Sequence, residues 1–353
     1  MRIAIWPIFS LLALACLLVC GLAASRSAAE PPPAAARLAP AAVAPAPASA
    51  PAVVTSPEGC LIEKFDVPSP SMKRQIHAVV VLPPEYKDHP DKRYPILYTL
   101  HGARAPYATY SEMSPLRRAL RDRPMIVTCF DGDPVGMYVD SPVKADSQFE
   151  TFFFQEFVPY IDAHYRTNGQ RGVEGFSMGG FGAFQYMLCK PEMFCSVSAM
   201  SGAFRMGGGP ARRGPGGGLL GDPNTNKKAR VRMDILARIE KAVKAGTRLP
   251  PMLIHCGTED GLIEGNRQLA KALVEHNKSI AEQVAKDPAV ASETDPAKKA
   301  KAQAGLLAAR KINFHYMESP GAHNWAFWRD GSEIVIDFHW RSFRDAPAKA
   351  GTK

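Results

Sequence analysis

The chain has 353 residues, and 46% of them are hydrophobic, which is enough for a folded core and excludes a wholly disordered or fibrous protein. Its 43 Lys and Arg residues against 34 Asp and Glu residues give a formal charge of +9. Residues 205–248 hold eleven of the basic side chains and only three acids, a net +8, so the rest is near neutral. This distribution argues against a protein coated with positive charge for nucleic acid.

Residues 1–24 have the features of a signal peptide. Arg2 supplies a positive start, residues 3–23 are almost wholly apolar, and the small residues Gly21 and Ala23 suit signal-peptidase cleavage. The segment therefore predicts a secreted or periplasmic protein. If it were not cleaved, it would anchor the chain in a membrane, because it approaches the roughly 20 residues that span a bilayer. A lipoprotein is less favoured, since Ala13-Leu14-Ala15, the residues before Cys16, match a lipoprotein cleavage site poorly.

The next segment, residues 25–58, is rich in proline and alanine, with eight prolines between residues 28 and 57. Such a composition cannot bury a core and favours extended polyproline conformations, so it predicts a linker. Residues 59–345 then have the size of one large α/β domain. Residues 346–353 are expected to be a disordered tail.

Short apolar runs and helical stretches alternate through this domain. Strands are expected at residues 75–82, 94–100, 125–130, 172–176, 196–200, 252–256 and 312–317. Helices are expected at residues 112–121, 148–164, 178–189, 230–245, 263–277 and 333–343. Several of the strands are continuously apolar, as in a sheet buried on both faces. The pattern predicts an α/β fold with a mostly parallel sheet, helices on both faces and functional loops at the strand C-termini.

Two segments interrupt the alternation. Residues 203–226 are rich in Gly, Arg and Pro and predict a long loop. Residues 278–311 are rich in Ala, Lys and Glu and predict a helical insertion, which we interpret as a solvated hairpin rather than a partner-binding element. Cys189 and Cys195 flank a predicted helix end and would either form a disulfide in an oxidising compartment or remain thiols.

Residues 173–182 read VEGFSMGGFG and contain a G-x-S-x-G motif centred on Ser177. In this motif a serine sits on a tight turn from a strand into a helix, and glycines flank it because side chains there would crowd the backbone. The helix N-terminus then favours negative charge that develops beside the serine. Because the motif follows a predicted strand and opens a predicted helix, we interpret Ser177 as a nucleophile.

A serine nucleophile needs a base, and the base needs an acid to orient it. In chains with this motif the acid follows the serine, and the histidine that serves as base follows the acid. Asp260 comes just after the strand at 252–256, with Glu259 as its alternative. His323 lies in a turn after the last predicted strand. The sequence therefore predicts a triad of Ser177, Asp260 and His323.

An oxyanion hole requires backbone N–H donors near the nucleophile. The strand at 94–100 leads into His101, Gly102 and Ala103, and Gly102 allows a sharp turn there. We expect the amides of Ala103 and Met178 to be the donors, Gly102 to border the substrate, and His101 to brace the loop rather than perform chemistry.

Further side chains were weighed for metal and substrate binding. Asp131, Asp133 and Asp140 follow a strand, but acids in a Gly/Pro loop are more often turn and capping residues, so neither a metal nor a cofactor is predicted. The three phenylalanines at residues 152–154 are interpreted as core packing.

Trp325 and Trp328 lie beside His323 and would either line an acyl pocket or simply pack. Arg205, Arg212 and Arg213 follow a strand C-terminus on the active-site side and would attract an anionic ester. The later basic residues, 227–248, are expected to form a solvated helix face.

Several of these segments resemble the esterases of the esterase D and S-formylglutathione hydrolase type, whose relatives include feruloyl and acetyl-xylan esterases and the mycobacterial mycolyltransferases. The resemblance runs from about Gln75 to Phe343. It is carried by YTLHG, FQEFVPYIDAHYRT, GFSMGGFGAF, CGTEDGLIEGNRQL and PGAHNWAFWR. It implies an α/β-hydrolase fold, ester hydrolysis without a metal, and the same triad.

The sequence departs from that family at two positions. Asn324 stands where members often carry an acid, and Glu174 is an unusual charge near the nucleophile, expected to be paired with a basic side chain or partly exposed. The leading hypothesis is a secreted or periplasmic serine esterase that acts on a small-molecule or carbohydrate-linked ester. The alternatives are an acyltransferase to a sugar or lipid hydroxyl and a non-catalytic binding module. Nucleic acid is not expected as a partner, and a membrane only through an uncleaved signal segment.

Overall fold

A nine-stranded sheet organises the domain in the computed structural model, which describes residues 52–204, 218–221, 226 and 231–346. The strand order is β1-β2-β3-β5-β4-β6-β7-β8-β9. The strands are β1 (Ala52–Thr55), β2 (Leu61–Ser69), β3 (Arg74–Leu82), β4 (Tyr94–Leu100), β5 (Ile126–Phe130), β6 (Thr167–Phe176), β7 (Ser196–Met200), β8 (Met252–Gly257) and β9 (Phe314–Ser319). The pairs β1–β2, β2–β3 and β3–β5 are antiparallel, and every later pair in this order, from β5–β4 to β8–β9, is parallel. The predicted mostly parallel sheet is confirmed.

The strands β1 and β2 were not predicted. β1 lies inside residues 25–58, the range expected to be a linker, and pairs Val53 with Glu63 and Thr55 with Leu61. That range is therefore corrected: four of its last residues belong to the sheet, because main-chain pairing with β2 makes a strand of a segment too short to be recognised from its own sequence. The predicted signal peptide at 1–24 lies outside the described residues, as does the tail at 346–353 apart from Ala346.

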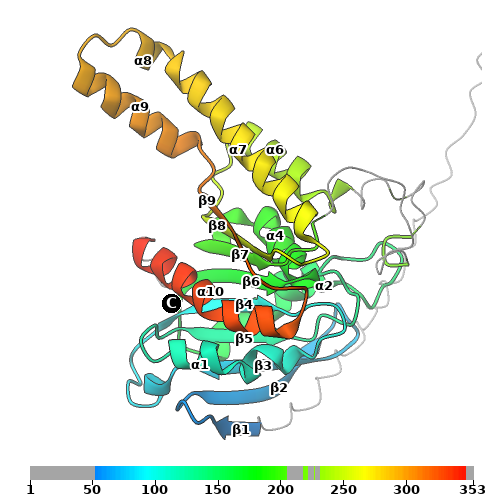
Figure 1. Cartoon of the computed structure of the whole chain (residues 1–353). Helices are drawn as coiled ribbons and strands as arrows, with labels where there is room; N and C mark the ends of the chain where they lie inside the picture. The colour runs from blue at the N-terminus through cyan, green and yellow to red at the C-terminus, as the bar shows by residue number, and fades with distance from the viewer. Residues whose placement is uncertain (1–51, 205–217, 222–225, 227–230, 347–353) are drawn as a thin grey trace, which may run out of the picture. The chain divides into compact units, whose positions relative to one another are not determined.

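Helices cover both faces of the sheet. They are α1 (Ser114–Ala119), α2 (Phe149–Thr151), α3 (Val158–His164), α4 (Met178–Cys189), α6 (Ile235–Lys244), α7 (Ile263–Ala285), α8 (Pro288–Ala291), α9 (Pro296–Arg310) and α10 (Trp325–Asp345). Shorter helical turns are η1 (Pro84–Tyr86), η2 (Tyr107–Glu112), the π-helical η3 (Phe152–Phe157) and η4 (Pro191–Met193). Figure 1 shows α1 and α10 together on one face of the sheet.

The two faces have separate apolar cores. One core contains Phe153, Phe184 and Ile254 and packs α4 and η3 against the sheet, while the other contains Leu116, Phe176 and Ile336 and packs α1 and α10. Phe152 and Phe153 are fully buried, as predicted for core residues, because the strands on this face are apolar on the side that meets them.

The predicted insertion at 278–311 is helical. It continues α7 well past residue 277 and adds α8 and α9, which pack on α7 through a small apolar cluster that includes Ile280, Val284 and Val290. Figure 1 shows these three helices extending beyond β8 and β9. None of the helices within the described residues is long and apolar enough to cross a membrane.

Candidate active site

Ser177 lies on the turn between β6 and α4 with a backbone φ of 57° and ψ of −118°. Such a conformation is rare for a residue with a side chain and stores strain at the turn. The flanking glycines permit it, because a Cβ on Gly175 would overlap the backbone of Gly179, and a Cβ on Gly179 would overlap the carbonyl oxygen of Leu100. The predicted crowding at both flanking positions is confirmed.

The structure brings the three predicted triad residues together from the C-terminal ends of three parallel strands. Nε2 of His323 lies 2.9 Å from Oγ of Ser177, and Nδ1 of His323 lies 2.9 Å and 3.0 Å from the two carboxylate oxygens of Asp260. In this arrangement Nδ1–H donates to Asp260, so Nε2 is free to accept the hydroxyl proton of Ser177. The side chain of Asp260 is fully buried, whereas His323 is one-third exposed.

Asp260 is held as a carboxylate by its surroundings. Burial opposes the charge, but hydrogen bonds from His323, Ser201 and the amide of Leu262 outweigh it and hold the pKa of Asp260 below its usual range. The acid loop and the histidine loop are also joined by a main-chain hydrogen bond of 2.9 Å from Glu259 to the carbonyl of Gly321. The side chain of Glu259 is exposed and is not part of the hydrogen-bonded chain, which decides between the two candidate acids.

The predicted oxyanion loop packs against the nucleophile. A Cβ on Gly102 would overlap the ring of Phe176 and lie 3.3 Å from Cβ of Ser177. Met178, the second predicted donor, is the first residue of α4, where amides have no partner within the helix. Ala103 follows Gly102 directly and is exposed.

His101 braces this loop through both ring nitrogens. Nδ1 lies 2.8 Å from the carbonyl oxygen of Gly102, and the amide of Gly132 donates to Nε2 over 2.8 Å. Burial lowers the pKa of His101 below its usual value, so the ring is neutral at pH 7. Because the carbonyl of Gly102 and the N–H of Ala103 share one planar peptide and point in opposite directions, fixing the carbonyl also fixes the N–H.

The chain matches the Esterase family model, described as "Putative esterase", over residues 69–331. This chain belongs to the Esterase family. An esterase of Mycobacterium tuberculosis is 34% identical to it over 131 residues, which are 35% of the chain and 28% of that relative. The match thus spans little more than a quarter of the curated relative.

Two solved structures have the same fold as this chain. The S-formylglutathione hydrolase from Agrobacterium tumefaciens is 20% identical, with a TM-score of 0.61 and coverage of 82% of this chain and 98% of the other. The fluorophosphonate-binding serine hydrolase F of Staphylococcus aureus is 17% identical, with a TM-score of 0.60 and coverage of 80% and 98%. The predicted α/β-hydrolase fold and the family resemblance are confirmed.

Trp325 and Trp328 lie beside the triad. The ring of Trp328 stacks on Phe176 at 4.4 Å between centroids and meets His323 edge-on at 4.9 Å. Trp325 meets Phe176 edge-on at 6.1 Å and remains 36% exposed, so it is available to a substrate. Arg205, predicted to bind substrate, lies outside the described residues, as do Arg212 and Arg213.

Glu174 has no basic side chain paired with it among the described residues and is not partly exposed, so both expectations are corrected. It is 1% exposed on β6 and contacts the Tyr110 hydroxyl, while its Oε2 has no hydrogen-bond partner among the described residues. Burial raises the pKa of Glu174 to about 8, and the hydrogen bond from Tyr110 opposes this only in part. The side chain is buried because β6 is a central strand covered on both faces.

Asp131 and Asp140 of the loop after β5 have the turn and capping functions predicted for them, and Asp131 accepts a hydrogen bond from the amide of Asp133 over 3.0 Å. Asp140 accepts hydrogen bonds from the amides of Glu150 and Thr151 at the start of α2, and Asp133 pairs with Arg74 over 2.6 Å. Within the described residues there is no group of three His, Cys, Asp or Glu side chains that could hold a metal ion.

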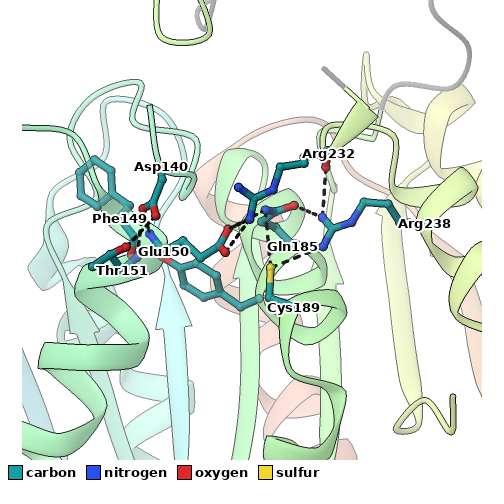
Figure 2. Close-up of polar contacts among 9 residues, drawn as sticks. Asp140, Phe149, Glu150, Thr151, Gln185, Cys189, Arg232 and Arg238 are labelled. Carbon is teal, nitrogen blue, oxygen red and sulfur yellow. Dashed lines mark hydrogen bonds and ion pairs between the residues drawn. The ribbon is translucent and has the colours of Figure 1, made fainter. Parts of the chain in front are cut away.

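Cys189, at the end of α4, does not form the disulfide with Cys195 that was one of the two predicted outcomes. Its sulfur lies 3.4 Å from Nη2 of Arg238 and 3.8 Å from Nε2 of Gln185 (Figure 2). Burial raises the pKa of the Cys189 thiol above its usual value, so the thiol is uncharged at pH 7.

The basic residues around α6 are not simply a solvated helix face. Nη2 of Arg232 lies 2.6 Å from both carboxylate oxygens of Glu150, and Nη1 of Arg238 donates to Oε1 of Gln185 (Figure 2). The expectation for residues 227–248 is therefore corrected at two positions, because acceptor oxygens of Glu150 on α2 and Gln185 on α4 face these guanidinium groups. Residues 227–230 lie outside the described residues.

Sequence reasoning missed Ser201, which is buried beside Asp260. The available signal was its position directly after β7, on the edge of the sheet where the functional loops gather.

Proposed function

We propose that this esterase is a secreted or periplasmic serine hydrolase that cleaves carboxylic esters through an acyl-enzyme. The observation that supports the proposal is the continuous hydrogen-bonded chain from Ser177 through His323 to Asp260. The family model supports the same activity class. A non-catalytic binding module would have no need for a strained serine aligned with a histidine and a buried acid.

The reaction follows from this geometry. Oγ of Ser177 attacks the ester carbonyl carbon while Nε2 of His323 takes the hydroxyl proton. Collapse of the tetrahedral intermediate breaks the bond to the leaving alkoxide, which receives that proton from His323. Asp260 stabilises the imidazolium formed in between, and its low pKa keeps it charged for this purpose. A water molecule then attacks the acyl-enzyme by the same steps.

The amides of Met178 and Ala103 would bind the negative oxygen of each tetrahedral intermediate. The strained turn places Met178 at the N-terminus of α4, where the helix dipole also favours negative charge. His101 and Gly102 hold the peptide that carries the second donor. Such N–H donors would stabilise the transition state more than the bound ester, because the negative charge on the oxygen is larger in the transition state, and they would therefore lower the barrier.

Water rather than an alcohol is the proposed acceptor. Among the described residues the hydrogen bond between Ser177 and His323 is exposed, which favours water as the acceptor. An acyltransferase has to exclude water from this point. Product analysis with and without alcohol acceptors tests this directly: free acid as the sole product supports hydrolysis, and an ester of the added alcohol as the main product contradicts it.

The proposed location rests on residues 1–24. Expression of the full chain followed by fractionation and N-terminal sequencing should find mature protein outside the cytoplasm that begins near residue 25. Full-length protein in the cytoplasm would contradict export.

The activity is tested by the Ser177→Ala variant on p-nitrophenyl acetate. We expect kcat/KM to fall at least about 1000-fold, because the nucleophile is lost while binding remains. Ser279→Ala, an exposed serine on α7, is the matched control and should retain full activity. A fluorophosphonate probe should label the wild type and the control but not Ser177→Ala. Full activity in folded Ser177→Ala would contradict the proposal.

A further inference from the structure

Ser201 is fully buried where β7 ends, between the strand that precedes the nucleophile and the strand that precedes the acid. Its amide donates to the carbonyl of His255 on β8 over 2.8 Å, and the amide of Ser177 donates to the carbonyl of Met200 over 2.9 Å. The backbone φ of Ser201 is 52°, in the left-handed region, which costs a serine about 1 kcal/mol or more. A strained serine at a position that glycine would fill without strain suggests that its hydroxyl is needed.

The partners of that hydroxyl determine where its proton goes. Nε1 of Trp328 lies 3.0 Å from Oγ of Ser201, and an indole N–H can only donate, so Ser201 is the acceptor in this bond. The hydroxyl proton must then point elsewhere. Apart from Trp328, the described side chains with which the Ser201 hydroxyl interacts are the carboxylate of Asp260 and the thiol of Cys256.

Of these two acceptors, the carboxylate is much the stronger. Burial raises the pKa of Cys256 to about 12, so its sulfur is an uncharged thiol and a weak acceptor. A hydrogen bond to a charged oxygen is about twice as strong as one between neutral groups. The remaining hydrogen bonds to Asp260 come from His323 and the amide of Leu262, which leaves room for a third donor.

Trp328 also contacts Phe176 and His323, which lie on two other sides of the triad. Its ring stacks on Phe176, the residue before the nucleophile, and meets the imidazole of His323 edge-on. One side chain of α10 thus restrains the base directly and the acid through Ser201. The contacts cross from α10 to β7 and β6, which are distant in the chain.

We propose that Trp328 and Ser201 are positioning residues of the triad: the indole N–H turns the Ser201 hydroxyl toward Asp260, and Asp260 in turn holds His323 in line with Ser177. This inference rests on the proposed esterase activity. It assigns Trp328 a role in orienting the catalytic groups in place of the predicted choice between lining an acyl pocket and plain packing.

The test uses purified full-length protein and p-nitrophenyl acetate. Ser201→Gly removes the hydroxyl and relieves the strained φ, and Trp328→Phe keeps an aromatic ring but removes the N–H. For Ser201→Gly we expect kcat to fall about tenfold with KM changed less than twofold, because a hydrogen bond to a charged group is lost without loss of substrate contact. Trp328→Phe should show the same kind of change, about fivefold.

The double variant Ser201→Gly/Trp328→Phe shows whether Trp328 acts through Ser201 or whether the two residues affect kcat independently. If the indole acts through Ser201, the double variant should lose about as much kcat as Ser201→Gly alone, and not the roughly 50-fold product of the two effects. The matched control is Ser198→Ala, which removes another buried β7 hydroxyl, one bound to His339 instead of the triad, and should keep the wild-type kcat.

Three results would overturn the inference. Wild-type kcat in Ser201→Gly would show that its hydroxyl is not needed, and multiplicative losses in the double variant would show that the two residues act separately. A raised KM with unchanged kcat in Trp328→Phe would assign Trp328 to substrate binding. Failure of this inference can be told apart from failure of the proposed function, because only Ser177→Ala tests the proposed function. If Ser177 is essential, the proposed esterase activity stands whatever the Ser201 and Trp328 variants do.

Discussion

Replacing Glu174 with glutamine is expected to stabilise the folded protein by an amount that grows with pH. Glu174 is almost fully buried, and burial raises its pKa from the ordinary value of 4.5 to about 8. A carboxyl whose pKa is higher in the folded state contributes its full stability below pH 4.5 and loses it as the pH rises through 8. Glutamine has nearly the same shape and does not ionise, so the variant escapes this loss.

The magnitude follows from the two pKa values. At pH 7 the unfolded chain has ionised Glu174 and the folded chain has not, so the penalty is about 3 kcal/mol over the 2.5 pH units above 4.5. At pH 9 both states are ionised and the penalty reaches its limit of about 5 kcal/mol. At pH 4 it vanishes. These values are large beside a typical total stability of roughly 5–15 kcal/mol.

Urea denaturation at pH 4, 7 and 9 measures the effect as the difference in unfolding free energy between variant and wild type. Glu282→Gln, an exposed glutamate on α7, is the control and should show no pH-dependent difference. The glutamine carbonyl can still accept the hydrogen bond from Tyr110. If Glu174→Gln and the wild type lose stability in parallel between pH 4 and 9, then Glu174 is not the buried neutral acid inferred above.

Three other substitutions test separate parts of the site. Asp260→Asn should reduce kcat on the order of 10⁴-fold with the fold intact, since an amide no longer holds His323 in the required tautomer; near-normal steady-state activity would contradict the assignment of the acid. His101→Ala should lower kcat about tenfold at nearly constant KM, because the peptide of the oxyanion loop loses its brace, and a change in KM alone would argue for a substrate contact. Asn324→Ala should cost about 1 kcal/mol in urea denaturation, because the Asn324 side chain accepts from the amide of Phe327 and caps α10; unchanged stability would refute the capping role.

The triad could be predicted because each of its members is marked by adjacent residues. Ser177 has glycines on both sides, and Asp260 and His323 each follow a strand whose apolar run is visible in the chain. Parallel strands place their C-terminal ends along one edge of the sheet, so chain order and strand ends were enough to bring these side chains together. The capping of α10 by Asn324 is also local, because its side chain accepts a hydrogen bond from the amide of Phe327, three residues further along the chain.

Antiparallel additions at the edge of the sheet were harder to predict. β2 mixes charged, polar and apolar residues, and β1 has only four residues, of which Val53 and Val54 are largely exposed. Their strand conformation depends on the partner strand, since each is stabilised by hydrogen bonds to the neighbouring strand of a hairpin and not by a continuous apolar run of its own. The linker predicted from the Pro/Ala-rich composition, residues 25–58, therefore included the residues that form β1.

By itself the sequence determined the parallel sheet, the strained nucleophile turn and the identities of the serine, the acid and the histidine, because periodicity and flanking glycines are properties of neighbouring residues. Only the tertiary structure decided that Glu174 is buried without a cation and that Trp328 reaches Ser201 across 127 positions of the chain. The physical reason is that burial and side-chain hydrogen bonds depend on which helix packs on which strand. Such packing joins distant segments, and no local pattern records it.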